Sequence, residues 1–267
     1  MAVRSALYHV MSAAALKAAR GLKRDFGEVE QLQVSVKGPG DFVSTADLKA
    51  ERVLREELAK ARPGFGFLME ESGETKGRDG RHRWIVDPLD GTTNFLHGIP
   101  HFAISIGLEE DGEIVAGLIY HPIADEIYWA EKGRGAYLND RRLRVSARRN
   151  LAESLIGTGI PFRSHGDHPR YLATLAAVMR ATSGVRRIGV ASLDLAYVAA
   201  GRFDGFWEFG LKPWDMAAGI VLVREAGGSV VGLSEGNVMH SGDIIAANAG
   251  IYGQLRALLT LPIAAAD

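Results

Sequence analysis

At its most informative point the chain reads Trp84-Ile85-Val86-Asp87-Pro88-Leu89-Asp90-Gly91-Thr92-Thr93-Asn94-Phe95. The apolar residues at its start predict a short strand over 83–86. We expect this strand to end at Asp87 and Pro88, because proline has no N–H group for a sheet hydrogen bond. Two acidic residues flank the turn that follows, and residues 91–94 can open a helix. The unpaired amides at a helix start suit an anion such as phosphate.

The periodicity of apolar residues predicts the elements on either side of this segment. An amphipathic helix is expected within residues 1–20, and a second helix over 47–62, capped by Ser44 or Thr45. Alternating patterns predict an antiparallel sheet from the segments 102–108, 114–121, 126–131 and 136–145. Beyond residue 150, strands at 154–159, 185–188, 203–208, 229–233 and 244–247 alternate with helices at 169–181, 192–200, 213–226 and 251–261. We therefore expect a layered α/β fold in a single domain of residues 1–267, with an N-terminal half over 1–150 and a C-terminal half over 151–267.

Composition excludes several classes of protein. The chain has 267 residues, of which 47% are hydrophobic and 24% charged, as in an ordinary globular protein. It contains no cysteine, which excludes disulfides, thiolate metal sites and cysteine nucleophiles and favours a cytoplasmic location. No apolar run approaches the ~20 residues of a membrane span, so no membrane partner is expected.

The charge distribution bears on possible nucleic-acid partners. The formal net charge of −1 argues against a general attraction to nucleic acid. A basic run between Arg141 and Arg149 nevertheless leaves a local interaction open. It contains Arg141, Arg142, Arg144, Arg148 and Arg149.

Acidic residues mark the candidate site. Glu70 follows the apolar run 65–69, Asp87 and Asp90 flank the turn, and Asp215 falls in the first turn of a predicted helix. Taken singly, Glu70 can lie in a solvated loop, and Asp215 can simply complement a helix dipole. If the acids converge, two carboxylates about 4 Å apart repel by ~4 kcal/mol at an effective dielectric constant of 20, so the site must take up protons or cations. Oxygen ligands favour magnesium, manganese or calcium over zinc, and a nearby phosphate favours magnesium.

Four segments, in their order and spacing, closely resemble the inositol monophosphatase family. They are Phe42-Val43-Ser44-Thr45-Ala46-Asp47, Glu70-Glu71-Ser72, the segment 84–95 quoted above, and Trp214-Asp215-Met216-Ala217-Ala218-Gly219. The resemblance covers nearly the whole chain. It implies a five-layer α-β-α-β-α sandwich of the inositol monophosphatase and fructose-1,6-bisphosphatase type, in a protein that is usually a homodimer. It also implies a magnesium-dependent, lithium-sensitive phosphomonoesterase that hydrolyses inositol 1-phosphate.

The resemblance implies a role for each matching residue. Two or three magnesium ions per site would be held by Glu70, Asp87, the Leu89 carbonyl, Asp90 and Asp215. The catalytic residues would be Asp47 and Thr92, which orient the attacking water, together with Glu70. Substrate would contact Gly91, Thr92, Asp90, Gly189, Ala191, Glu208 and Asp215, with the amides of Gly91 and Thr92 on phosphate and Glu208 on the polyol hydroxyls. Two positions depart from the family pattern, Met69 before the paired glutamates and Val190 with Ser192 after Gly189.

Other functions stay open at this stage. Histidinol phosphate, fructose 1,6-bisphosphate and phosphoadenosine phosphate are alternative substrates on the same fold. A phosphoaspartyl mechanism would make Asp87 the nucleophile, but enzymes of that type resemble Asp-x-Asp, whereas Asp87 and Asp90 stand three residues apart. A regulatory or RNA-associated protein that uses the basic run is a third possibility.

Overall fold

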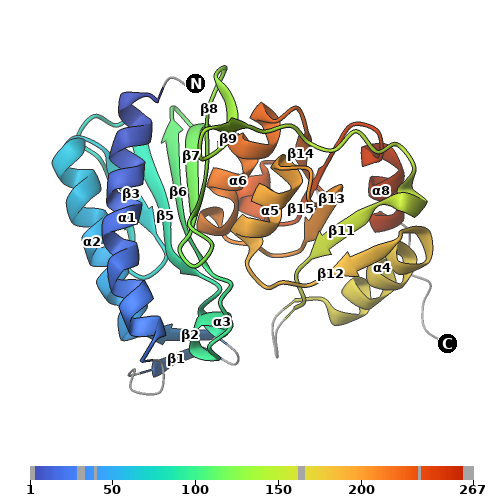
Figure 1. The fold of residues 1–267 in the computed structure, drawn as a ribbon, viewed down its shortest axis with the longest axis horizontal. Helices are drawn as coiled ribbons and strands as arrows, with labels where there is room; N and C mark the ends of the chain where they lie inside the picture. The colour runs from blue at the N-terminus through green and yellow to red at the C-terminus, as the bar shows by residue number, and fades with distance from the viewer. Residues whose placement is uncertain (1–3, 29–33, 39–40, 162–165, 234–235, 261–267) are drawn as a thin grey trace.

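The structure is a computed structural model that describes residues 4–28, 34–38, 41–161, 166–233 and 236–260, and only the backbone at 34–38 and 41–43. Its helices and two sheets alternate in five layers along the long axis of the molecule (Figure 1). The larger sheet has eight strands in the order β10-β9-β8-β7-β6-β5-β3-β4, and the smaller has five in the order β12-β11-β13-β15-β14. The predicted α-β-α-β-α sandwich is confirmed.

The larger sheet belongs to the N-terminal half. Its strands are β3 (Gly66–Met69), β4 (Gly73–Thr75), β5 (His82–Asp90), β6 (Ala103–Glu110), β7 (Glu113–His121), β8 (Glu126–Glu131), β9 (Gly135–Leu138) and β10 (Arg141–Arg142). Every pair of neighbours is antiparallel except β3 and β5, which are parallel. Helices α1 (Ala6–Phe26) and α2 (Thr45–Ala61) cover one face, over an apolar cluster that includes Leu54, Trp84 and Ile106. A hairpin of β1 (Val34–Gly38) and β2 (Asp41–Ser44) leads into α2.

The smaller sheet lies between two pairs of helices. Its strands are β11 (Leu155–Thr158), β12 (Gly184–Arg186), β13 (Gly205–Glu208), β14 (Ser229–Gly232) and β15 (Ile244–Ala247). Helices α5 (Ala191–Ala199) and α6 (Pro213–Glu225) separate the two sheets, whereas α4 (His168–Ala181) and α8 (Tyr252–Leu259) cover the outer face. Because side chains alternate along a strand, Phe206 joins the cluster around α5 and α6, and Trp207 joins the cluster under α4 and α8. The short helices are α3 (Thr92–Leu96), α7 (Val238–Ser241) and a 3-10 turn at Leu151–Glu153.

Three predicted elements differ from the structure. The first helix begins at Ala6, because the Ser5 hydroxyl accepts a hydrogen bond from Tyr8 N at 3.0 Å, and it continues to Phe26; residues 1–3 of the predicted range lie outside the described residues. The predicted strand over 136–145 is two strands, since Asn139 adopts a left-handed φ of 51° between them.

The third difference is at Pro88, which does not end β5. Pairing with β3 stops at Val86, and the register with β6 shifts between Asp87 and Asp90. The missing N–H of Pro88 therefore falls where the ladder is already irregular. No helix within the described ranges is long and apolar enough to cross a membrane.

Candidate active site

The parallel pairing of β3 and β5 brings two acidic residues together. Met69, the last residue of β3, pairs with Val86. Glu70 follows directly, and its N donates a hydrogen bond to Val86 O at 3.2 Å. Parallel strands end at the same edge of a sheet. Glu70 and Asp87, the residues that come directly after the last pair of Met69 and Val86, therefore lie side by side at that edge. The charge of Glu70 accordingly helps to raise the pKa of Asp87.

The turn after Asp87 is held by its own hydrogen bonds. Asp87 Oδ1 accepts from Leu89 N at 2.9 Å, and the Leu89 carbonyl accepts from Thr92 Oγ1 at 3.0 Å. Gly91 precedes α3 with a left-handed φ of 93°, and a Cβ there would stand 2.7 Å from Cγ2 of Val190. Only glycine suits this position in both backbone conformation and space.

Helix α2 delivers Asp47 to the same place. Asp47 lies in the first turn, where its Oδ2 accepts from Ser44 N at 2.9 Å and from Ser44 Oγ at 2.5 Å. Its other oxygen, Oδ1, accepts from Thr92 Oγ1 at 3.0 Å. The predicted pair of Asp47 and Thr92 is therefore in contact. Burial raises the pKa of Asp47, although the hydrogen bonds from Ser44 and Thr92 oppose this effect.

Helices α5 and α6 bring residues of the C-terminal half to the turn. Ser192 N donates to Asp90 Oδ2 at 2.8 Å, and the amides of Ala191 and Gly91 also bond to the Asp90 carboxylate. Asp215 lies in the first turn of α6, where its Oδ2 accepts from Lys212 N at 2.7 Å. The site is thus built from both halves of the chain.

The acidic residues raise one another's pKa values. Burial raises the pKa of Asp87 well above its usual range, and the charges of Glu70, Asp90 and Asp215 raise it further. Burial likewise raises the pKa of Asp215, with Asp90 and Glu70 adding to the effect, and raises that of Asp90 to about 6. Carboxylates that destabilise each other's ionised form are stabilised by a bound cation.

This oxygen donor set has the chemistry that magnesium prefers. The residues that would hold it are Glu70, Asp87, Leu89 through its carbonyl, Asp90 and Asp215. As they stand, no three His, Cys, Asp or Glu side chains in the described part of the chain are grouped closely enough to hold a metal ion. Carboxylate groups would therefore have to turn to close around one.

Glu208 is the last residue of β13. It lines a small cavity together with Gly159, Pro161, Tyr171 and Phe209. Burial raises the pKa of Glu208 to about 8, helped by the charge of Asp90 and opposed by that of Arg187.

Gly189 and Ala191 precede and begin α5. Gly189 has a left-handed φ of 85°, and a Cβ there would stand 2.5 Å from a guanidinium nitrogen of Arg187. Ala191 is 7% exposed. The described residues thus place all the predicted site residues at the ends of β3, β5 and β13 and the starts of α2, α3, α5 and α6.

Comparison with known proteins settles the family. The model of the inositol monophosphatase family matches residues 3–263. The chain belongs to this family. It is 60% identical over 261 residues to an inositol-1-monophosphatase of Rhizobium meliloti (strain 1021), covering 97% of this chain and 98% of that protein. It is also 43% identical over 236 residues to the Nus factor SuhB of Escherichia coli (strain K12), covering 88% of each.

A solved structure supports the fold. The extragenic suppressor protein suhB from Bartonella henselae superposes with a TM-score of 0.94 at 59% identity, covering 97% of this chain and 100% of that one. The predicted membership of the inositol monophosphatase family is confirmed, and the chain is a phosphatase of that family.

The two departures from the family pattern have simple structural explanations. Met69 is fully buried in the apolar cluster under α1 and α2, so its side chain points away from the turn that carries Glu70. Val190 packs against Gly91, which leaves no room for a side chain at that glycine.

Two residues that were not predicted from the sequence, Gly159 and Asp194, shape this inositol monophosphatase site. Gly159 lies directly against the Glu208 carboxyl, and a Cβ there would stand 1.8 Å from Oε1. Asp194 is 1% exposed, and neither carboxylate oxygen has a hydrogen-bond partner among the described residues. Burial raises its pKa well above the usual range, and Glu208 and Asp90 add to this. No sequence pattern marks either residue.

Proposed function

We propose that this chain is a magnesium-dependent phosphomonoesterase that hydrolyses inositol 1-phosphate to inositol and phosphate by direct attack of water. The observation that carries this proposal is the convergence of Glu70, Asp87, Asp90 and Asp215, which raise one another's pKa values beside the hydrogen-bonded pair of Asp47 and Thr92. The name of the Rhizobium relative supports the substrate.

The carboxylates divide into two overlapping ligand sets. Glu70, Asp87, the Leu89 carbonyl and Asp90 would hold the first magnesium ion, and Asp87, Asp90 and Asp215 the second, with two or three ions per site. When bound, magnesium makes water more acidic and neutralises charge on the phosphoryl oxygens. The same proposal includes inhibition of phosphate release by lithium.

Thr92 and Asp47 are arranged to handle the proton of the attacking water. Because Thr92 Oγ1 donates to Asp47 Oδ1 or to the Leu89 carbonyl, both at 3.0 Å, its lone pairs are free to accept a hydrogen bond from water. The raised pKa of the buried Asp47 suits it to take up the proton that Thr92 passes on. Glu70, which lies beside Asp87, is the third residue of the proposed catalytic set.

The substrate would lie between α3 and the end of β13. The Thr92 amide and the Gly91 amide, which is shared with Asp90, would contact phosphate beside Asp90 and Asp215. The polyol ring would pack on Gly189 and Ala191. The carboxyl of Glu208, whose pKa is about 8, would hydrogen-bond to its hydroxyls.

A substrate panel tests this proposal. We expect purified protein to release phosphate from inositol 1-phosphate with magnesium, with a higher kcat/KM than from histidinol phosphate, fructose 1,6-bisphosphate or phosphoadenosine phosphate. A higher kcat/KM for one of these three would change the proposed substrate but not the proposed reaction, the magnesium-dependent hydrolysis of a phosphate ester. A trapped acyl phosphate on Asp87 would instead establish the phosphoaspartyl mechanism.

We also propose that residues 1–267 form one domain, because α5 and α6 pack against both sheets, and that two copies form a homodimer. Leu172 and Met179 on α4 are 61% and 60% exposed, and their seven-residue spacing puts them on one helical face. Light scattering of the protein as it elutes from a size-exclusion column measures its oligomeric state. A cytoplasmic location stays a prediction from the absence of cysteine.

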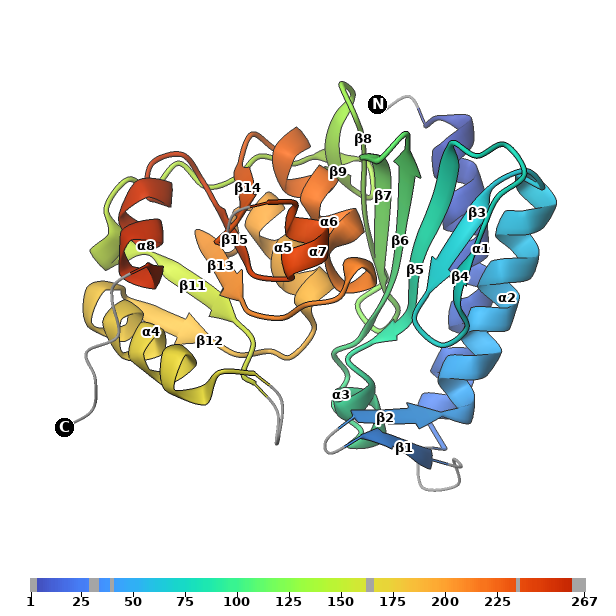
Figure 2. The same ribbon diagram turned by 180° about the vertical axis from the view of Figure 1, so that it is seen from behind.

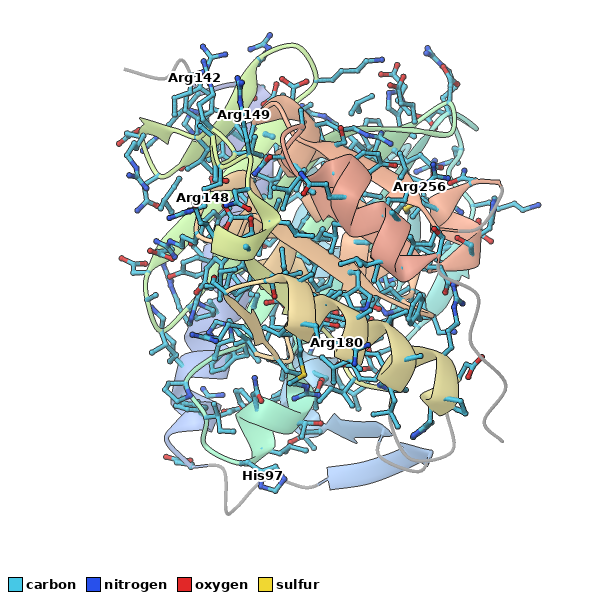
Figure 3. All side chains as sticks on the ribbon, turned by 90° about the vertical axis from the view of Figure 1, so that its right-hand side faces the viewer. His97, Arg142, Arg148, Arg149, Arg180 and Arg256 are labelled. Atoms are coloured by element: carbon cyan, nitrogen blue, oxygen red, sulfur yellow. The ribbon has the colours of Figure 1, made fainter. Side chains whose placement is uncertain are left out.

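A second function, binding to RNA or to an acidic partner, is favoured by the basic run and by the Nus factor name of the E. coli relative. In Figure 3 Arg142, Arg148 and Arg149 gather along one edge of a face that also carries Arg180 and Arg256. Arg148 is engaged with Asp204 at 3.2 Å, whereas the guanidinium groups of Arg149, Arg180 and Arg256 form no ion pair with another described residue.

Substitution of the basic run tests this second function. Alanine at Arg141, Arg142 and Arg144 should weaken RNA binding and leave phosphate release unchanged. Equal RNA binding by the variant and the wild type would remove the run from any such role.

A further inference from the structure

One face of α2 contacts both the active site and the turn that carries Glu70. Asp47, Glu51 and Arg55 are spaced four residues apart and therefore lie on the same face of the helix. Figure 2 shows β3 and β4 beside α2 at the edge of the larger sheet. Asp47 reaches Thr92, and the other two residues reach the turn between these strands.

Glu51 holds the backbone directly after Glu70. Its side chain is buried, with 6% exposure for the residue, and its Oε2 accepts from Glu71 N at 2.8 Å. A carboxylate that accepts from an amide forms a charge-assisted hydrogen bond. The Glu71 amide shares its peptide group with the Glu70 carbonyl, and Glu70 N itself donates to Val86 O at 3.2 Å. Both peptide groups that flank the Glu70 Cα are thus fixed.

Arg55 holds the rest of the turn. Its Nη2 donates to Ser72 Oγ at 3.1 Å and to Thr75 Oγ1 at 3.3 Å. The guanidinium also lies over the ring of Phe67, 5.0 Å from its centroid. The same helix therefore contacts β3, the turn and β4.

We propose that α2 positions the metal site through two residues: Glu51 holds the backbone of Glu70 so that its carboxylate faces Asp87, and Arg55 holds the rest of the same turn. This inference rests on the proposed magnesium-dependent function. A group that fixes the orientation of a metal ligand lowers the conformational entropy that is lost when the metal ion binds, because the ligand is already ordered. Loss of Glu51 should therefore weaken magnesium binding although Glu51 itself contacts no ion.

Calorimetric titration of magnesium into the metal-free full chain tests the role of Glu51. Glu51→Leu, which removes the acceptor at similar size, should raise the magnesium Kd by about tenfold or more. Glu51→Gln should recover most of the affinity, because its amide oxygen still accepts from Glu71 N. Glu56→Leu is the matched control, an exposed glutamate on the same helix, and should bind as the wild type does.

The same variants give a kinetic readout that a purely structural role would not produce. For Glu51→Leu the magnesium concentration at half-maximal rate should rise in parallel with the Kd, while kcat at saturating magnesium changes little. Wild-type magnesium affinity in a folded Glu51→Leu would overturn the inference and leave the proposed function standing. Absence of magnesium binding by the wild type would instead overturn the metal assignment itself.

A variant of the second contact covers the case in which Glu51→Leu does not fold. Arg55→Met removes the hydrogen bonds to Ser72 and Thr75 but keeps an apolar side chain over Phe67. It should also raise the magnesium Kd, because the turn loses its other contact with α2. An unchanged Kd in Arg55→Met would then overturn the inference.

Discussion

Gly159→Ala is expected to move Glu208 without changing its charge. The added methyl group would stand 1.8 Å from Oε1 and 1.9 Å from Cδ of Glu208, whereas real Cβ contacts are at least 3.0 Å, so the carboxyl group must shift by more than an ångström. Gly159 has no left-handed φ, and alanine therefore adds no backbone strain. The displaced carboxyl group can no longer hydrogen-bond to a polyol held on Gly189 and Ala191.

The size of the effect depends on the protonation of Glu208, whose pKa is about 8. Below that pH the protonated carboxyl makes neutral hydrogen bonds worth about 0.5–1.5 kcal/mol, and above it the carboxylate makes charge-assisted bonds worth about 1.5–3 kcal/mol. Loss of one bond should lower kcat/KM by about 2- to 13-fold at pH 7 and about 13- to 160-fold at pH 9.

The assay compares kcat/KM for inositol 1-phosphate with that for p-nitrophenyl phosphate, whose leaving group has no other hydroxyl. The ratio should fall in Gly159→Ala, and adding Gly159→Ala to Glu208→Gln should have little further effect. Gly253→Ala is the control, because a methyl group there meets open space. An unchanged ratio in folded Gly159→Ala would refute the assignment of Glu208 to the polyol.

Four further substitutions test other parts of the site. Asp90→Asn and Asp215→Asn should each abolish magnesium-dependent phosphate release and raise the Tm of the metal-free protein, because each removes one of several mutually repelling charges; a fully active Asp90→Asn would contradict the assigned roles. Thr92→Val should lower kcat about 100-fold, with a calorimetric magnesium Kd close to that of the wild type; a kcat near the wild-type value would remove the hydroxyl from the reaction. Asp194→Asn should stabilise the protein increasingly as the pH rises above 3.8, because burial raises the folded-state pKa of Asp194 and its ionisation therefore disfavours the folded state; parallel curves of Tm against pH would show that Asp194 is not buried as a charge.

Much of the fold was predictable because the periodicity of the apolar residues and the positions of the turn residues indicate the same helices and strands. The limits of β8 and β15, Glu126–Glu131 and Ile244–Ala247, were predicted to the residue, since each is a short run rich in apolar residues with turn residues on both sides. The end of β5 was not, because a proline rule applies to a regular ladder and Pro88 lies at a shift of register.

The candidate site was predictable where residues adjoin in sequence or match a family motif. Asp87, Asp90 and Thr92 lie on one turn. The contribution of Gly159 could not be predicted, because it depends on the packing of a loop after β11 against the end of β13. Glu51 left a usable signal, its spacing of four residues from Asp47 on a predicted helix, but its partner is a backbone amide, and amides carry no sequence signature.

Phosphate release from inositol 1-phosphate by the purified full chain, measured with magnesium and with a chelator, tests the central claim most directly. We expect rapid release with magnesium, inhibition of that release by lithium, and none with the chelator. Equal release in the presence of the chelator, or no release at any magnesium concentration, would contradict the account.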